Sequence, residues 1–436
     1  MRILLISDLP PCSNHTSGLL IDRLCDYLLD NGHEVSAYIV KADVVQVEIP
    51  QNKIDRMTFD LARKPRENWG AWKLGRLGSV LGDLFVTSAQ IPRILRRITS
   101  FAEEMQAELI WAPVQGQTMA RLIRPAAERI HVPYVVQVFD PINWWFQANA
   151  VDGWTQKRVM KEFGRMIHGA QCFIGASPNM ATVYAAQYSC RNSVPIMMPF
   201  DAAKTYVSKR VKRTVNTFVI ALAGQLYAYG TIMSLLVSLN SIKWSYRGKK
   251  IIFRVYGANM HFDIPVPCFM EYRGWVPQEE LLEELAEADL LYCPYRFDPD
   301  FEETARLSFP GKLSTYMRTG VPILVHSPEY AGITHFIRER QCGYILESVV
   351  MEDIVNAIQT IMDDQPNLNY SKTALDVSDR ELSLQAMYKN FAQALGIPLH
   401  DTYMGRGKTC TGENDVEDEF KTRKLREVVE NGSFQL

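Results

Sequence analysis

Short apolar segments alternate with amphipathic helical segments along most of this chain. Residues 2–7 are nearly all apolar, an apolar stripe at helical spacing follows over residues 20–28, and a second apolar segment occupies residues 33–40. These two periodicities predict a strand, a helix and a second strand, with the two strands buried and parallel. The chain is therefore expected to fold into parallel sheets that are covered by helices on both faces.

The same pattern continues in two successive runs. In the first run, after residue 107, it predicts strands at 109–112, 132–139, 172–174 and 194–198, and helices at 118–130 and 155–167. In the second run it predicts strands at 218–223, 251–256, 270–273, 289–293, 322–325 and 343–346, and helices at 278–287 and 313–319. At 436 residues the chain is too long for one ordinary core. The predicted fold class is α/β, with two doubly wound sheets.

A basic stretch of low apolar content separates the two runs. We assign residues 1–200 to a first domain, 201–216 to a linker and 217–379 to a second domain. The apolar helix near residues 380–397 is expected to pack back on the first domain. Residues 401–436 are polar and charged, which predicts a disordered tail.

Charge and cysteine content exclude several classes of protein. A net charge of -2 provides no surplus of Lys and Arg, so no nucleic-acid partner is expected. The eight cysteines never approach Cys-x-x-Cys spacing, which argues against a zinc ribbon or a redox pair. The chain opens on a strand pattern rather than a signal peptide, and no apolar run approaches the ~20 residues that cross a bilayer. We therefore expect a cytoplasmic protein.

The ligand site of an open parallel sheet lies beyond the carboxyl ends of its strands. In the second run those ends are the loops that begin at Gly224, Gly257, Gly274, Pro294 and His326. Glycine lets the backbone approach a ligand closely, although a glycine also simply ends many strands. Three glycines at equivalent positions favour a binding site at this edge.

The segment 308–313 is the sharpest local signal. Pro310 and Gly311 precede a helix, so free amides at its first turn could receive a diphosphate. Ser308 and Lys312 would add a hydroxyl and an ammonium group. The alternative is an ordinary helix start with an exposed lysine.

Residues 309–324 read Phe-Pro-Gly-Lys-Leu-Ser-Thr-Tyr-Met-Arg-Thr-Gly-Val-Pro-Ile-Leu. This segment resembles the Pro-x-Lys-(Leu or Ile)-x-Glu-Tyr-(Met or Leu)-Ala-x-Gly-x-Pro-Val segment of GT-B glycosyltransferases, in the large retaining group that includes sucrose and glycogen synthases. Collinear pieces agree: the Gly18 loop, Gly-His-Glu-Val at 32–35, Ala-Ser-Pro-Asn-Met at 176–180 and Gly-Trp-Val-Pro at 274–277. The resemblance covers about residues 1–395. It implies a GT-B fold, in which a Rossmann-like acceptor domain and a Rossmann-like donor domain face a central cleft.

The resemblance also implies roles for individual residues. A nucleoside-diphosphate-sugar donor would bind the second domain, with its sugar near His326, although a core role for this histidine is the alternative. Asp140 ends a strand of the first domain and would bind acceptor or sugar hydroxyls, or else only start a turn. Gly18 would lie on the acceptor side. The implied donor-binding residues are Gly224, Gln225, Arg254, Gly257, Trp275, Val276, Ser308, Phe309, Pro310, Gly311 and His326, and the implied catalytic residues are Asp140 and Lys312.

The chain departs from the family pattern at several positions. Leu307 and Thr315 stand where family members carry two glutamates with seven residues between them. Gln225 and Gly230 stand where relatives carry an arginine and a lysine after the first donor strand. The cations that could compensate are Lys312, Arg306, Arg296 and Arg254.

The reaction implied by the resemblance moves a sugar from a nucleoside diphosphate to an acceptor hydroxyl with retention, in polysaccharide or glycoconjugate biosynthesis. It requires no enzyme nucleophile and no cofactor besides the donor, and the absence of a His/Cys cluster in the sequence leads us to expect no obligatory metal. A nucleotide-sugar epimerase of the same architecture is one alternative. A degenerate protein that binds a sugar nucleotide without catalysis is the other.

Residues 69–101 interrupt the alternation of strands and helices. Their aromatic and leucine residues recur at helical spacing and are interleaved with Lys73, Arg76, Arg93, Arg96 and Arg97. Such a surface would lie on anionic lipid without crossing it, which predicts peripheral contact with the inner face of the membrane and a glycan or lipid-linked acceptor. The alternative is an insertion that packs on the first sheet with a solvated basic edge.

Overall fold

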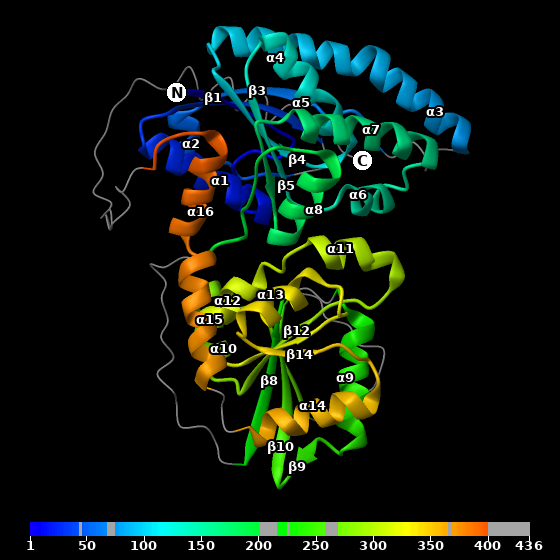
Figure 1. Cartoon of the computed structure of the whole chain (residues 1–436), viewed down its shortest axis with the longest axis vertical. Helices are drawn as coiled ribbons and strands as arrows, with labels where there is room; N and C mark the ends of the chain where they lie inside the picture. Colours follow the sequence, from blue (N-terminus) through cyan, green and yellow to red (C-terminus); the bar gives the residue numbers. More distant parts are fainter. Residues whose placement is uncertain are drawn as a thin grey trace.

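The computed structural model describes residues 1–42, 46–67, 75–200, 216–224, 227–257, 269–364 and 368–399. They form two α/β domains, each with a predominantly parallel sheet covered by helices, and the first domain lies above the second in Figure 1. Gln225, residues 201–215 of the expected linker and the expected tail at 401–436 lie outside the described residues.

The first sheet is entirely parallel. Its strands in spatial order are β3 (Thr58–Arg63), β2 (Glu34–Lys41), β1 (Arg2–Ser7), β4 (Leu109–Val114), β5 (Tyr134–Val138), β6 (Cys172–Gly175) and β7 (Ser193–Pro195). The strand order reverses between β1 and β4, where a doubly wound sheet opens a crevice for ligands. The edge strand β3 is not among the expected elements, because its polar and apolar residues alternate and form no continuous apolar run.

Two helical layers cover this sheet. Helices α1 (Thr16–Asp30) and α16 (Leu384–Leu395) cover one face, with α2 (Gln51–Arg56) beside α1. Helices α4 (Ile91–Glu104), α5 (Gly116–Ile130), α7 (Gly153–Gly169) and α8 (Pro178–Tyr188) cover the other, and α6 (Ile142–Ala148) follows β5. Helix α16 belongs to this core although it is the last described helix. Its Tyr388 stacks on Tyr27 with ring centroids 4.6 Å apart, and its Phe391 meets Trp111 at 4.8 Å.

Residues 75–104 form one long bent helical segment at the outer edge of the first domain (Figure 1). Helix α3 (Gly75–Phe85) passes through a π-helical turn at Val86–Gln90 into α4. Helix α4 packs its apolar side on the sheet, whereas several apolar side chains of α3 remain exposed. Within the described ranges, no helix combines the length and the apolar character that a membrane span requires.

The second sheet has the spatial order β11 (Met270–Gly274), β10 (Lys249–Tyr256), β8 (Thr217–Ala223), β12 (Leu290–Pro294), β13 (Ile323–His326) and β14 (Tyr344–Leu346), with β9 (Ser245–Tyr246) antiparallel to β10. Helices α9 (Tyr229–Ser241) and α14 (Met351–Asp363) cover one face. The other face carries α10 (Gln278–Ala286), α12 (Lys312–Arg318), α13 (Gly332–Arg340) and α15 (Leu368–Glu381). A 3-10 turn (Pro299–Phe301) and α11 (Glu302–Leu307) follow β12.

The two domains touch through α8 and α11. Leu307 at the end of α11 is 4% exposed and packs in the apolar core of the first domain. Its carbonyl accepts a hydrogen bond from the Ser177 hydroxyl, and the Tyr184 hydroxyl donates to Glu303 at 3.3 Å. Farther along the contact, the backbones of Phe200 and Ser383 pair, so the two chain segments that pass between the domains lie side by side.

Candidate functional site

Lys312 begins α12, and its ammonium group points into the protein. Its Nζ has almost no accessible surface and no hydrogen-bond partner among the described residues, although other atoms of the residue are partly exposed. Burial lowers the pKa of this ammonium below its ordinary value, and the neighbouring Cys293 opposes the shift only in part. The exposed lysine considered as an alternative from the sequence is therefore wrong. An unpaired buried cation is an arrangement that an anionic ligand would complete.

The surroundings of Lys312 leave room for such a ligand. Gly224, directly after β8, has a φ of 99°, and a Cβ atom placed on it would lie 3.6 Å from both Cε and Nζ of Lys312. The ring centroid of Tyr227 lies 5.5 Å from Nζ, which permits a cation–π interaction. A glycine at the end of β8 therefore keeps the space beside the ammonium free of a side chain.

The loop before α12 adds a second unpaired polar group. The Ser308 hydroxyl is buried and has no hydrogen-bond partner among the described residues. Phe309 anchors the loop by packing edge-on against Phe336 at 5.0 Å, and Pro310 is buried. Gly311 is exposed and its carbonyl accepts from the Ser314 hydroxyl at 2.8 Å. Because α12 has only seven residues, the side chains of this loop are better anion ligands than the helix terminus.

Asp140 lies at the carboxyl edge of the first sheet, just after β5. It lines a small pocket with Gly116, Trp144 and Trp145. Part of its surface is open, yet desolvation by the surrounding protein raises the pKa of its carboxyl group. Its charge also reaches the second domain, where burial, Cys293 and Asp140 together raise the pKa of Tyr295.

Two tyrosines connect the Asp140 side of the site with the Lys312 side. Tyr295 directly follows β12, and its ring meets that of Tyr227 at 5.7 Å in a perpendicular arrangement. Tyr227 in turn lies beneath the Lys312 ammonium. Neither tyrosine is among the residues predicted from the sequence. Tyr295 could have been found as the neighbour of Pro294, a predicted strand end, whereas no sequence signal marks Tyr227.

Of the four cations that could compensate for the missing family residues, three are held in ion pairs. The partners are Glu271 for Arg254 (2.7 Å), Asp298 for Arg296 (2.9 Å) and Glu302 for Arg306 (2.6 Å). Arg254 also lies within β10 rather than at its carboxyl end. Among these four residues, only Lys312 makes no ion pair or hydrogen bond within the described part of the chain, so it is the cation on which donor binding would depend.

His326 has a core role. It is fully buried at the end of β13, and both ring nitrogens are engaged: Nδ1 lies 2.7 Å from the Tyr292 hydroxyl and Nε2 lies 2.7 Å from the Ser348 carbonyl. Burial lowers the pKa of the imidazole to about 4. A neutral ring that donates from Nε2 to the carbonyl and accepts at Nδ1 satisfies both contacts. The expected contact between His326 and the donor sugar is therefore not what the structure favours.

The buried histidine leads to an expected pH dependence of stability. An unfolded histidine binds a proton near pH 6.5 and His326 in the folded protein only near pH 4, so the unfolded state binds more protons between these values. The free energy of unfolding should fall by up to about 3 kcal/mol as the pH falls through this window. Denaturant titrations of His326→Gln should show a shallower decline than the wild type between pH 6.5 and 4. Parallel curves would assign the pH dependence to other groups.

The other expected donor residues form a separate group at the β11 edge of the sheet. The Gly257 amide donates to the Gly274 carbonyl at 2.8 Å, and the Gly257 carbonyl accepts from the Tyr272 hydroxyl at 2.7 Å. Trp275 is 74% exposed, and Val276 packs partly on the second core. The exposed indole is free to stack on a base, but no described contact joins this group to Lys312.

Gly18 is buried at the start of α1. A Cβ atom there would lie 2.1 Å from the Cys12 sulfur and 3.3 Å from the Pro10 carbonyl oxygen. Glycine is therefore needed so that the loop after β1 can pack on α1. Any effect of Gly18 on an acceptor would act through the shape of this loop.

Two doubly wound α/β domains in contact, each with a predominantly parallel sheet, define the fold class of this protein. The chain has the fold of the GT-B glycosyltransferases. Within the described residues, no cluster of three His, Cys, Asp or Glu side chains has the arrangement of a metal site.

Comparisons with known proteins agree with this class. Residues 237–380 match the family described as glucosyltransferase 3-like, C-terminal domain. A sucrose-phosphate synthase from Thermosynechococcus elongatus is 13% identical, with 90% of this chain and 97% of that chain covered and a TM-score of 0.61. HepE of Anabaena, solved in complex with UDP-glucose, is 13% identical over 90% and 99% of the two chains, with a TM-score of 0.57. WaaG, a glycosyltransferase involved in lipopolysaccharide biosynthesis, is 13% identical over 91% and 98%, with a TM-score of 0.54. A search of curated protein sequences finds no match.

Proposed function

We propose that this protein is a cytoplasmic hexosyltransferase that moves a sugar, with retention, from a nucleoside-diphosphate-sugar to an acceptor hydroxyl of a glycan or lipid-linked glycan. The observation that carries the proposal is the buried ammonium of Lys312 beside Gly224, which no described residue pairs by a hydrogen bond or an ion pair. The unpartnered hydroxyl of Ser308 lies in the loop that leads to it. In a GT-B fold these groups lie on the donor side, where a diphosphate would supply the missing counter-charge.

The two sides of the site have distinct roles in this proposal. Lys312 and the Ser308 hydroxyl bind the diphosphate and stabilise the negative charge that develops on it as the sugar leaves. Asp140 binds a hydroxyl of the acceptor or of the donor sugar, and contact between the domains holds the two substrates together. Because Lys312 supplies the counter-charge, the proposed reaction requires no metal. The chain would act in polysaccharide or glycoconjugate biosynthesis.

Calorimetric titration and a transfer assay test this function together. The full-length protein is titrated with UDP, ADP and GDP and then incubated with the corresponding glucose nucleotides and a panel of acceptor glycosides. Glycosyl transfer would be supported by tight binding of one nucleoside diphosphate in the titration. In the transfer assay, the same nucleoside diphosphate should then be formed from its glucose nucleotide only when an acceptor is present. If none of the nucleotides binds, the assignment of Lys312 and Ser308 to a donor site would be contradicted.

A sugar-nucleotide-binding protein without catalysis is the second candidate function. One observation favours it: Leu307, at the position of a family glutamate, is buried in the first domain and is not available to a sugar. Nucleotide binding without release or transfer, over the full acceptor panel, would support this candidate instead of the enzyme.

Replacing Asp140 with asparagine separates a catalytic role from a turn role. The side chain makes no hydrogen bond that would fix the turn within the described structure, so the melting temperature of Asp140→Asn should stay close to that of the wild type. Loss of a charged hydrogen bond to a substrate hydroxyl should lower kcat by about 10- to 100-fold. Asp376→Asn, at an exposed position of α15, is the matched control. Equal kcat in all three proteins would leave Asp140 a turn residue.

A further inference from the structure

Helix α3 differs from an ordinary surface helix because its apolar side faces the solvent. Its apolar residues face outward, with Leu77 75%, Leu81 62%, Leu84 44% and Phe85 53% exposed. Their spacing of four, three and one residues places them on a single face of the helix. Four exposed large apolar side chains on one helical face form a continuous apolar stripe. Exposed apolar patches of this kind mark sites that bind a protein or a membrane.

The opposite face of α3 is held to the first domain by polar contacts. The Ser79 hydroxyl donates to Asp152, and Asp83 is buried between the guanidinium groups of Arg121 and Arg158. These contacts fix the rotation of α3 about its axis, so the leucine face cannot turn inward without breaking a buried ion pair. The outward direction of the apolar stripe is thus built into the fold.

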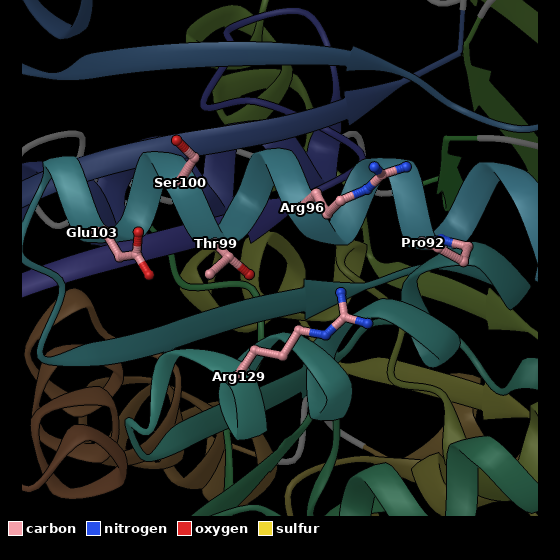
Figure 2. A pocket seen from close by; sticks show the side chains of 6 residues that line it. All are labelled: Pro92, Arg96, Thr99, Ser100, Glu103 and Arg129. Atoms are coloured by element: carbon pink, nitrogen blue, oxygen red, sulfur yellow. The ribbon is translucent and has the colours of Figure 1, made fainter.

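A basic pocket lies farther along the same helical segment, between α4 and α5. Pro92, Arg96, Thr99, Ser100 and Glu103 of α4 and Arg129 of α5 line an open hollow of about 480 Å³ (Figure 2). Figure 2 shows the guanidinium groups of Arg96 and Arg129 at the same end of the hollow, with Glu103 at the other end. Within the ranges that the structure describes, neither arginine makes an ion pair, whereas Arg97 is paired with Asp60 at 2.9 Å. Two unpaired guanidinium groups with nearby hydroxyls form a site for a phosphate.

The helical layer that contains the pocket carries more unpaired cations than unpaired carboxylates. Among the described residues of α4, α5 and α7, the exposed cations without an ion pair are Arg93, Arg96, Arg129, Lys157 and Lys161, and the exposed carboxylates without one are Glu103 and Glu104. The surface therefore carries an excess of positive charge although the whole chain has a net charge of -2. In Figure 1 this helical layer lies at the end of the molecule away from the second domain.

We propose that the outer surface of α3, α4, α5 and α7 docks on an anionic lipid bilayer, with the leucine face of α3 in the interfacial layer and a lipid head-group phosphate held by Arg96 and Arg129. An apolar stripe bordered by cations is the surface that binds peripherally to anionic membranes. Docking would hold the protein beside a lipid-linked acceptor, but it does not require catalysis. This proposal restricts the expectation for residues 69–101 to residues 75–101, the part that the structure describes, and adds Arg129, which lies outside the segment.

The test is co-sedimentation of the full-length protein with vesicles, without any nucleotide. Vesicles of phosphatidylglycerol and phosphatidylcholine in equal parts should bind the protein at low salt, and vesicles of phosphatidylcholine alone should bind it weakly. Raising the salt concentration should weaken binding because exposed charges are screened. Binding to both kinds of vesicle with equal strength would contradict the charge argument, and binding to neither would overturn the proposal.

Paired variants separate the head-group site from general positive charge. Arg96→Gln with Arg129→Gln should weaken binding by about 30-fold. Arg124→Gln with Arg165→Gln removes the same charge from α5 and α7, but these arginines are already paired with Glu128 and Glu162, so the loss should be clearly smaller. Equal losses in the two pairs would show that the surface binds by diffuse charge and would overturn the head-group assignment.

The apolar part is tested in the same assay. Leu77→Ser with Leu81→Ser should weaken vesicle binding by about 10-fold or more. Val237→Ser with Val349→Ser, at exposed positions of the second domain, should leave it unchanged. If the leucine variant instead converts a dimer to a monomer while vesicle binding is absent, α3 contacts a second copy of the chain and the proposal fails. Nucleotide titration of the same variants reports donor binding separately.

Discussion

Lys312→Met is expected to lower kcat/KM for the sugar donor by about 10²- to 10³-fold, the usual effect of removing one preorganised group that stabilises charge in a transition state. Methionine keeps the length of the buried side chain and removes only the ammonium. Since that ammonium makes no hydrogen bond or ion pair with the described residues, its loss should not lower the melting temperature. Steady-state kinetics, nucleotide calorimetry and thermal unfolding measure the three quantities.

The protonation of Lys312 provides a second readout. Burial lowers the pKa of the ammonium, and a bound diphosphate should raise it again. Nucleotide binding at alkaline pH should therefore take up protons, which calorimetry detects as a dependence of the apparent enthalpy on the ionisation enthalpy of the buffer. Lys312→Met should abolish this dependence, and Lys372→Met, at an exposed position of α15, should not. Wild-type affinity in Lys312→Met would place the diphosphate elsewhere.

The second large effect is expected at the position of the first family glutamate. Leu307→Glu, which restores the family residue, should lower the free energy of unfolding by about 3 kcal/mol or more. The substitution removes a buried leucine from the core of the first domain and introduces a carboxylate there. For a domain of this size the melting temperature should fall by about 6 °C or more.

Thr315→Glu is the matched comparison. It restores the second family glutamate at a partly exposed position of α12, where the expected change in stability is within about 1 kcal/mol. Leu307→Glu is not expected to increase turnover, because the side chain at position 307 points into the first domain. A stable Leu307→Glu protein with increased donor turnover would show that this residue can face the donor and that the domain contact is dispensable.

Much of the fold could be predicted because buried parallel strands are continuous apolar runs. Strand β1 coincides with the expected segment 2–7, β2 differs from the expected strand by one residue at each end, and β8 begins one residue earlier than expected. Strand β3 could not be found in this way because it lies at the sheet edge, where only some of its residues are buried. Strand periodicity reports burial, so it is weakest where a sheet ends.

The sequence indicates where the candidate site lies but not how its residues are arranged. The loop before α12 and the glycine after β8 can be predicted from the sequence, because a helix start and a glycine at a strand end are both recognised from neighbouring residues. The burial of Lys312, the ion pair of Arg254 and the core contacts of His326 depend on residues far away in the chain. For the same reason the sequence alone could not show that Leu307 joins the two domains or that the leucines of α3 face outward.

The placement of α16 also affects how the chain acquires its structure during synthesis. The first sheet is complete at Pro195, but its core still lacks Tyr388 and Phe391, which fill the space beside Tyr27 and Trp111. At about 5–20 residues per second, translation needs roughly 10 to 40 seconds more to deliver them. During that interval the apolar face that α16 later covers is open to chaperones and to other nascent chains. A ribosome that stalls within the second domain would therefore release two incomplete domains, not one finished domain and one fragment.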